Sequence, residues 1–206
     1  MRNVISVILL TFMSLSCYAQ KFTEDDAIIE ISEAAAALHT MHCNFTQTKS
    51  LKMLGENMVS KGKLDCNQPD KLRWEYTMPY NYIFILNGTQ VEIKKGKKSD
   101  VIDVNQNKLF KEIVRIMMNS LLGKCLSDKK SFKATVVQSG NSYIATLIPM
   151  RREMKDMFSK IVLYYNRSAK VINKVLLHEK NGDSTTIELI DIRTNINIDA
   201  SVFKID

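Results

Sequence analysis

The chain contains little glycine and proline, with 7 Gly and 3 Pro among 206 residues. Disordered, collagen-like and low-complexity proteins are rich in these residues, so those classes are excluded. Apolar residues make up 45% of the chain and charged residues 25%, as in an ordinary globular protein. No linker-like stretch and no internal repeat interrupts the sequence. At this length we expect a single domain with a sizeable core.

The common catalytic motifs are also missing. The sequence has no glycine-rich phosphate loop and no HExxH, CxxC or GxSxG motif, so the usual nucleotide-binding, zinc-protease, redox and hydrolase signatures are absent. Acidic pairs such as Asp25 and Asp26 fall at a predicted helix start, where carboxylates serve as caps. The sequence therefore predicts a protein that is not an enzyme and needs no cofactor.

One short cluster carries metal-ligand chemistry. His39, His42 and Cys43 offer the nitrogen and sulfur atoms that zinc or copper binds. The cluster falls where a helix is expected to turn into a strand, which breaks the regular spacing of a preformed site. Cys43 is also explained by a pairing with Cys66, given below. We therefore expect no metal.

Long apolar runs are absent except at the start of the chain. There, Arg2 precedes an apolar run that ends at Leu15, and small residues at Cys17 and Ala19 stand where a signal peptidase cleaves. We predict a signal peptide over residues 1–19, cleaved after Ala19, and one mature domain over residues 20–206. The alternative is a lipid-modified Cys17, although Leu15 lies one place from where a good lipidation site has it. No later stretch approaches the roughly 20 apolar residues of a transmembrane helix.

The chain carries a modest positive charge. It has 29 Lys+Arg against 22 Asp+Glu, a net charge of +7, which suits contact with anionic lipid or an acidic partner surface. The basic residues are scattered apart from the lysines of residues 94–98, and the aromatic residues do not interleave with Arg, so we expect no nucleic-acid binding. The lysine cluster reads as a solvated hairpin tip that blunts a sheet edge.

Two helices are expected. Thr23 followed by Asp26 resembles a capping box, and apolar residues then return at helical spacing, which predicts a helix at the start of the mature chain. A second helix is predicted over residues 107–122, ended by Gly123. Its wide apolar face carries Leu109, Ile113 and Met117.

Most of the remaining sequence alternates with the period of a β-strand. In residues 41–93, Leu72, Trp74 and Tyr76 share one face, and Tyr82, Phe84 and Leu86 repeat the arrangement. Further strands are predicted over residues 132–138, 142–148, 158–165, 171–178 and 184–192. About ten short strands with two inserted helices predict a mainly β (α+β) fold, a curved antiparallel sheet that needs something laid across it.

Three cysteines remain after processing, namely Cys43, Cys66 and Cys125. An odd number in a compartment that permits disulfides allows one pair and one free thiol. The segment between the first two reads as a hairpin, and the register that pairs Phe45 with Leu64 makes one face apolar and the other polar. The same register places Cys43 opposite Cys66. We predict a Cys43–Cys66 disulfide; the alternative is two reduced, inert thiols on the inner face.

Methionine is abundant. Because its side chain is unbranched and polarizable, a cavity lined with Met reshapes around flexible alkyl chains, although any single Met fills a gap in a core equally well. Several of them beside a concave aromatic sheet face favour an apolar cavity. The nine in the mature chain are Met41, Met53, Met58, Met78, Met117, Met118, Met150, Met154 and Met157.

Four segments together resemble a known family. They are residues 45–47 (FTQ), 61–64 (KGKL), 69–79 (PDKLRWEYTMP) and 87–88 (NG), of which the third is the most specific. The chain resembles the periplasmic outer-membrane lipoprotein carrier family, LolA-like, over essentially its whole mature length. In the closing segment, residues 196–205, Ile198 and Phe203 stand as the family's terminal strand does.

The resemblance implies an unclosed antiparallel β half-barrel covered by a helical lid. It also implies a carrier in the periplasm of a Gram-negative bacterium that takes lipidated proteins from an inner-membrane release complex to an outer-membrane receptor; we expect a monomer. The lid residues would be Leu109, Ile113 and Met117. The concave, lipid-binding side would carry Phe45, Leu64, Leu72, Trp74, Tyr76, Phe84 and Leu86.

One departure from the family pattern concerns the lid. Some members have an Arg directly before the Pro that opens the third strand, where it holds the lid closed, whereas here Gln68 precedes Pro69. Gln68 is expected to hydrogen-bond the lid without supplying charge. Two alternatives stay open: a LolA-like carrier of another amphiphile, such as a glycolipid or pigment ester, and an anchored periplasmic module that binds lipid or peptide.

Overall fold

The computed structural model describes residues 22–106, 111, 114, 115, 118, 119 and 122–205. The predicted signal peptide, with Cys17, lies outside the described residues. So do the predicted lid residues Leu109, Ile113 and Met117. No helix among the described residues is long and apolar enough to cross a membrane.

Helix α1 (Glu24–Ala37) begins as the sequence predicts. The Thr23 hydroxyl accepts a hydrogen bond from the backbone N–H of Asp26 (3.2 Å) and donates one to the Asp26 carboxylate (2.5 Å). This satisfies one of the amides that a helix start leaves without a partner. Ala27, Ile31 and Ala35 return every four residues and are buried, so they form the face that packs on the sheet.

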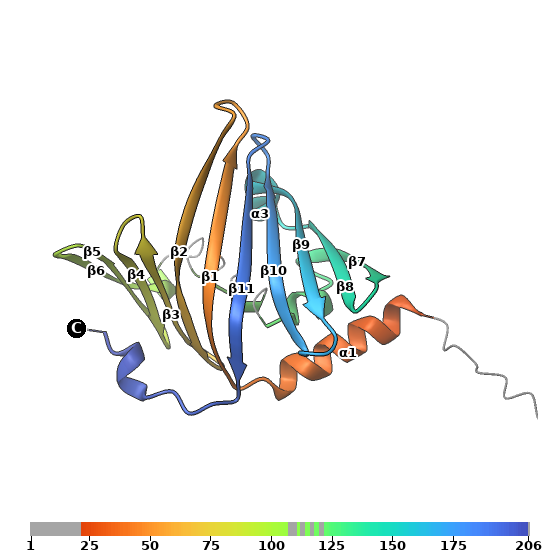
Figure 1. The fold of residues 1–206 in the computed structure, drawn as a ribbon, viewed down its shortest axis with the longest axis horizontal. Helices are drawn as coiled ribbons and strands as arrows, with labels where there is room; N and C mark the ends of the chain where they lie inside the picture. Colours follow the sequence, from red (N-terminus) through yellow and green to blue (C-terminus); the bar gives the residue numbers. More distant parts are fainter. Residues whose placement is uncertain (1–21, 107–110, 112–113, 116–117, 120–121, 206) are drawn as a thin grey trace, which may run out of the picture.

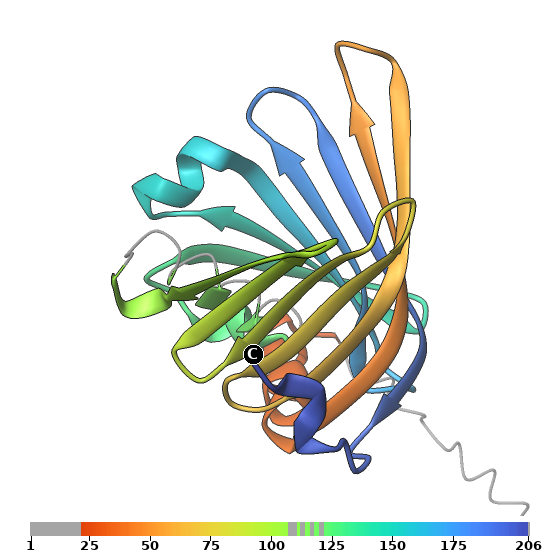
Figure 2. The ribbon, with the colours of Figure 1, turned by 90° about the vertical axis from the view of Figure 1, so that its left-hand side faces the viewer.

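In the part of the chain that the structure describes, eleven antiparallel strands form a single sheet (Figure 1). Two runs of strands, β1–β6 and β7–β11, meet where β1 pairs with β11, and the spatial order is β6-β5-β4-β3-β2-β1-β11-β10-β9-β8-β7. The edge strands β6 and β7 do not pair with each other, so the curved sheet stays an unclosed half-barrel (Figure 2). The predicted fold class is confirmed. The strands are β1 (Thr40–Leu51), β2 (Glu56–Asn67), β3 (Lys71–Met78), β4 (Tyr82–Asn87), β5 (Gln90–Lys95), β6 (Lys98–Asp103), β7 (Phe132–Ser139), β8 (Ser142–Pro149), β9 (Phe158–Asn166), β10 (Val171–Glu179) and β11 (Ser184–Thr194).

Short helices complete the fold. Helix α3 (Arg152–Met157) joins β8 to β9, and the described residues also form the 3-10 helices η1 (Val104–Gln106), η2 (Lys124–Ser127) and η3 (Ala200–Phe203). The described residues between 111 and 119 are helical, in agreement with the predicted second helix. Val114, Met118 and Leu122 return every four residues and are buried in the core.

The half-barrel has two different ends. We call the closed end the one where α1 runs into β1, with the turns at 68–70 and 88–89. The open end carries the tips of the β1–β2 and β10–β11 hairpins, the β3–β4 loop and α3 (Figure 1). The β1–β2 hairpin projects furthest. The lysine-rich turn between β5 and β6 also lies at this end, beside edge strand β6, as the sequence predicts.

The predicted register of the first hairpin is wrong by two residues. The sequence placed its turn at Leu54-Gly55, whereas the chain turns over four residues, Lys52 to Gly55, and Gly55 takes the left-handed conformation (φ 65°) that closes the turn. Cys43 therefore pairs with Leu64 and Cys66 with Met41. A shift of two keeps every side chain on its predicted face, which is why the alternation alone did not reveal it.

The predicted Cys43–Cys66 disulfide is wrong for the same reason. In the observed register the two cysteines are diagonal neighbours, for which Cβ atoms lie roughly 7 Å apart, against about 3.8 Å in a disulfide. Cys43 and Cys66 are free thiols, and both are buried, as Cys125 is. This matches the alternative of reduced thiols on the inner face.

The closing segment is not a strand. Residues 200–203 form the 3-10 helix η3, capped by the Asp199 carboxylate, which accepts from the backbone N–H of Ser201 (2.8 Å). We call residues 200–203 the strap; it lies along the outside of β3 and β4 (Figure 2). Phe203 and Ile85 are both fully buried there, and Arg73 donates to the Val202 carbonyl (3.4 Å). Burying Phe203 on the convex face stabilises the strap in place of strand pairing.

Candidate functional site

The concave face of the first five strands is a continuous apolar wall. Its central row runs across five strands and consists of Cys43, Leu64, Trp74, Phe84 and Ile93, each paired with the next. The side chains of one row point to the same face because the pairing is in register. Strand alternation thus gathers apolar groups that are up to 50 residues apart in sequence.

All seven residues predicted for the concave side belong to this wall or pack against it. Five are buried, and Tyr76 and Phe84 are half-buried against the same core. The structure brings them together on one face. The buried five are Phe45, Leu64, Leu72, Trp74 and Leu86.

Aromatic rings fill the wall toward the open end. Phe45 lies 5.0 Å from the Trp74 ring and 5.1 Å from the Tyr76 ring, and Tyr76 lies 5.9 Å from Tyr82. Phe45 covers Gly62, where an added Cβ would stand 2.7 Å from the Phe45 ring and 1.9 Å from a backbone oxygen. Glycine in the KGKL segment therefore makes room for the aromatic cluster.

The second half of the wall was missed by the sequence analysis. Strands β7 to β11 contribute buried residues that pair across the sheet in the same way, such as Phe45 with Leu189 and Val175 with both Ile187 and Leu163. The alternation of residues 158–192 held this signal. The motifs of the resemblance, however, lie in the first strands and therefore point to no residue of the later ones.

Gln68 holds the closed end together. Its side-chain amide donates to the carbonyls of Ala35 (3.1 Å) and Leu38 at the end of α1, and its oxygen accepts from the Lys124 ammonium of η2. The positive charge that Gln68 lacks is supplied by Lys124, which the sequence analysis did not single out. The bond of Gln68 to the predicted lid helix stays a prediction, because that helix's lid residues lie outside the described part of the chain.

The other end of α1 is fastened to strands β7 to β9. Tyr143 donates to the Glu30 carboxylate (2.8 Å), and the Arg167 guanidinium lies 3.5 Å from the same carboxylate and 4.7 Å from the centre of the Tyr143 ring. The Glu24 carboxylate accepts from the backbone N–H of Val136 (2.9 Å), on edge strand β7. Helix α1 is therefore attached to the rest of the fold at its start, its middle and its end.

Among the described residues, two pockets open at the mouth of the half-barrel. One, of about 440 Å³, lies at the β3–β4 loop and is lined by Tyr76, Met78, Tyr80 and Tyr82 among others. The second, of about 500 Å³, lies at the start of β9 and the end of β10, beside Phe158 and Leu177. Both volumes fall in the range of about 300–1,000 Å³ typical of small-molecule sites. The mouth can thus accept apolar groups at two places.

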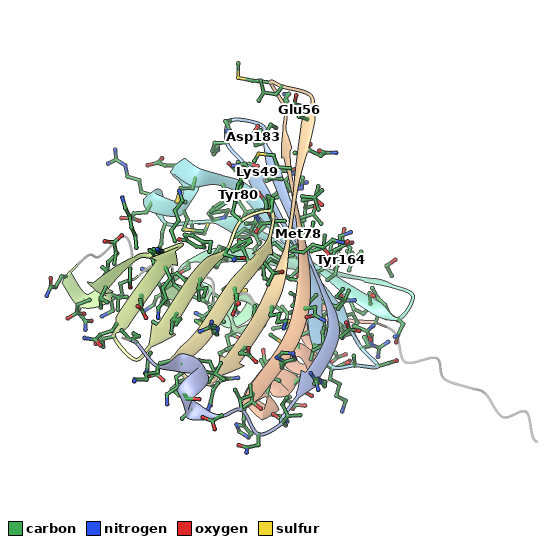
Figure 3. The ribbon with its side chains drawn as sticks, turned by 60° about the vertical axis from the view of Figure 1, so that its left-hand side comes forward. Lys49, Glu56, Met78, Tyr80, Tyr164 and Asp183 are labelled. Carbon is green, nitrogen blue, oxygen red and sulfur yellow. The ribbon has the colours of Figure 1, made fainter. Side chains whose placement is uncertain are left out.

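An ion pair lies on the inner face of the sheet, at the mouth of the half-barrel. The Lys49 ammonium lies 3.4 Å from the Glu179 carboxylate, which also accepts from the Thr185 hydroxyl (3.3 Å). Lys49 stands one row above the apolar wall, on the inward side of β1 (Figure 3). An ammonium here can donate to carbonyl or phosphate oxygens at the polar end of a bound amphiphile.

The buried thiols are chemically quiet. Burial raises the pKa of Cys43 and of Cys66 to about 12, so neither forms the reactive thiolate at neutral pH. His42 lies on the other face of the sheet, bonded to the Asp65 carboxylate (2.7 Å). The sheet therefore separates His42 from Cys43. Within the described residues, no group of three or more His, Cys, Asp or Glu side chains is arranged to hold a metal ion.

Comparison with known proteins agrees with this geometry. A family model described as "Outer membrane lipoprotein carrier protein LolA" matches residues 36–206. The chain belongs to the LolA family. An outer-membrane lipoprotein carrier protein of Francisella tularensis is 26% identical over 178 residues, 86% of this chain and 82% of the relative. One from Legionella pneumophila is 23% identical over 202 residues, 98% of this chain and 94% of the relative.

Solved structures share the LolA-family fold at low identity. The LolA superfamily protein NE2245 from Nitrosomonas europaea aligns with a TM-score of 0.50 at 10% identity, over 89% of this chain and 98% of the other. MucB, in its complex with MucA from Pseudomonas aeruginosa, aligns with a TM-score of 0.54 at 11% identity, over 89% of this chain and 61% of the other. These likenesses concern the fold.

Proposed function

We propose that this protein is a periplasmic carrier that binds the acyl chains of lipoproteins against the concave face of its half-barrel and shuttles them from the inner to the outer membrane. Family membership and the carrier names of its relatives support this assignment. The observation that carries it is the continuous apolar wall, which opens to solvent through the pockets at the mouth. The exported chain would begin at Gln20, after removal of residues 1–19.

The physical basis of binding is burial of alkyl surface. Each CH₂ group removed from water contributes about 0.8 kcal/mol, so the methylenes of one acyl chain suffice for tight binding without a catalytic group. Phe45, Trp74 and Tyr76 supply broad apolar rings to such a chain. The Lys49–Glu179 pair lies where the glycerol and peptide end of the cargo would leave the cavity.

The first experiment identifies what the protein carries. Protein purified from a periplasmic extract is analysed by native mass spectrometry, then denatured so that any bound molecule is released and identified. Triacylated lipoprotein is the expected companion. A different lipid would contradict the lipoprotein assignment and favour the alternative carrier, and an empty protein that also fails to bind a synthetic triacylated lipopeptide would contradict both.

The second experiment places the cargo on the concave face. The chain's single tryptophan, Trp74, reports binding of the lipopeptide through its fluorescence. Phe84→Asp puts a charge on the concave face of β4, and Ile83→Asp puts the same charge on the opposite face of the same strand. We expect Phe84→Asp to weaken lipopeptide binding at least about tenfold, since a carboxylate on the apolar wall must be desolvated. Equal weakening by Ile83→Asp would contradict the location.

A further inference from the structure

Exposed apolar side chains gather at the open end of the half-barrel. Among the described residues, eight of the large apolar side chains that face solvent lie there, five of them methionines. Figure 3 shows Met78 and Tyr80 on the rim of the sheet, below the projecting β1–β2 hairpin. We call this set the apolar collar. It consists of Met53, Leu54, Met58, Val59, Met78, Tyr80, Met150 and Met157.

The collar is most exposed at the tip of the β1–β2 hairpin. Met53 is 94% exposed and Leu54 is 66% exposed, and the two are adjacent at the apex of the hairpin that projects furthest (Figure 1). Because these two neighbouring side chains are exposed, they bury little apolar surface and contribute little to the stability of the fold. Clustered exposed apolar groups of this kind mark interaction surfaces.

The tip is held in a fixed position. The backbone N–H groups of Leu54 and Gly55 donate to the Leu51 carbonyl (3.2 and 2.9 Å), and the backbone N–H of Lys52 donates to the Asp183 carboxylate on the next hairpin (3.0 Å). The Lys52 side chain also lies against Gly182, where an added Cβ would stand 2.7 Å from it. The tip is therefore presented as a firm projection rather than a loose loop.

The charge around the tip favours an anionic surface. Lys52 begins the turn directly before Met53, Lys49 lies three residues earlier on the inward side of β1, and the whole chain has a net charge of +7. Two nearby acids are already engaged, Glu179 with Lys49 and Asp183 with the Lys52 amide; Glu56 is the acid on the opposite arm. Lysines beside an apolar tip extend their ammonium groups to phosphates while their stems stay with the apolar region.

We propose that the open end docks on the surface of a lipid bilayer, with Met53 and Leu54 inserted among the lipids and the rest of the collar at headgroup level. A projection of flexible apolar side chains fits a soft, deformable partner, whereas a folded protein partner would have to offer a pocket shaped to receive it. The proposal concerns the protein surface alone and does not depend on what the cavity carries. Docking in this orientation turns the mouth of the cavity toward the membrane.

Co-flotation with vesicles tests the proposal directly. Purified protein without cargo is mixed with phosphatidylcholine vesicles that contain a minority of phosphatidylglycerol, and the bound fraction is measured after centrifugation. We expect Met53→Asp/Leu54→Asp to reduce partitioning at least about tenfold, because each substitution replaces an inserting apolar group by a charged one. The control is Ile29→Asp, which changes an exposed apolar residue (54%) on α1, and it should bind as the unchanged protein does.

A fluorescent probe reports the depth of the tip independently. Because the three described cysteines are buried, a single added cysteine at Met53→Cys or Ile29→Cys can be labelled with an environment-sensitive dye. The Met53 position should shift to the blue on adding vesicles and the Ile29 position should not. The proposal is overturned if the unchanged protein does not float with vesicles, if the double Asp variant floats equally well while keeping its Trp74 emission, or if both labels respond alike.

Discussion

The two ends of the same strands differ sharply in how they are used. In β1 the first half alternates, with Met41, Cys43 and Phe45 buried, whereas none of its last six residues is buried. At the closed end, α1, Gln68 and Lys124 are joined by hydrogen bonds, while at the open end the apolar side chains of the collar face solvent. One end of the half-barrel therefore supplies the stability of the fold, and the other is left free for contact with other molecules.

The largest expected difference concerns buried side chains. Leu72→Ala, at the closed end, should lower the free energy of unfolding by about 3 kcal/mol, because it removes a fully buried side chain and leaves a cavity. Met58→Ala, at the open end, should change it by less than about 0.5 kcal/mol, since that side chain is 54% exposed. Urea unfolding followed by Trp74 fluorescence measures both. Similar losses in the two variants would contradict the division into two ends.

The second comparison uses two glutamines. Gln68→Leu removes the hydrogen bonds to the Ala35 and Leu38 carbonyls. It should lower the free energy of unfolding by about 2 kcal/mol, because carbonyls at a helix end are left without partners. Gln47→Leu removes the acceptor of the Tyr76 hydroxyl and should cost about 1 kcal/mol, since that tyrosine is half-buried.

Hydrogen exchange separates the two glutamine variants further. Amides of α1 should exchange faster in Gln68→Leu, because its closed-end attachment is lost, and should be unchanged in Gln47→Leu. Gln68→Arg tests the departure from the family pattern: an Arg at this position would face Lys124, so we expect it to be no more stable than Gln68. Faster exchange of α1 in Gln47→Leu would show that the open half also holds the helix.

The sequence predicted the closed end better than the open end. Alternation identified the wall residues because a buried face imposes a strict period of two, and the Thr23 cap set the start of α1. The turn at Lys52–Gly55 was misplaced because both registers keep the same residues inside. A long exposed hairpin therefore left its own register weakly specified, and the disulfide prediction failed with it.

The parts that the sequence missed depend on distant segments. Lys124 reaches Gln68 across 56 residues, and Tyr143 reaches Glu30 across 113. No local pattern encodes such pairs. The collar escaped notice for another reason: methionines look alike in a sequence whether they fill a core, as Met41 and Met154 do, or face solvent, as Met53 does. Only the three-dimensional structure shows which methionines are buried and which are exposed.

A pH titration probes the buried thiols of the closed end. The pKa of Cys43 and of Cys66 is raised by burial to about 12, above the value of 9.0 for an exposed thiol. As the pH rises from 9 toward 12, the folded state therefore keeps the thiol protons while the unfolded state loses them. The stability that the protonated thiols contribute is complete below pH 9 and is lost as the pH rises toward 12. Between pH 9 and pH 10 each thiol should lower the stability by about 1 kcal/mol. The decline should be shallower in Cys66→Ala, and an identical decline would exclude Cys66 as its source.

The smallest expected effect on stability is at the mouth. Lys49→Met removes the ion pair with Glu179. The Lys49 side chain is 37% exposed and that of Glu179 is 21% exposed, so solvent screening should keep the loss in the free energy of unfolding below about 0.5 kcal/mol. Binding of a triacylated lipopeptide should still weaken two- to threefold, roughly the value of one partly screened charged contact, and the difference should shrink as salt is added. Lys160→Met, which replaces a lysine on β9 beside His178, serves as the control for general charge. If Lys49→Met instead destabilised the fold as much as Gln68→Leu, the ion pair would stabilise the fold. The open end would then contribute to stability as the closed end does.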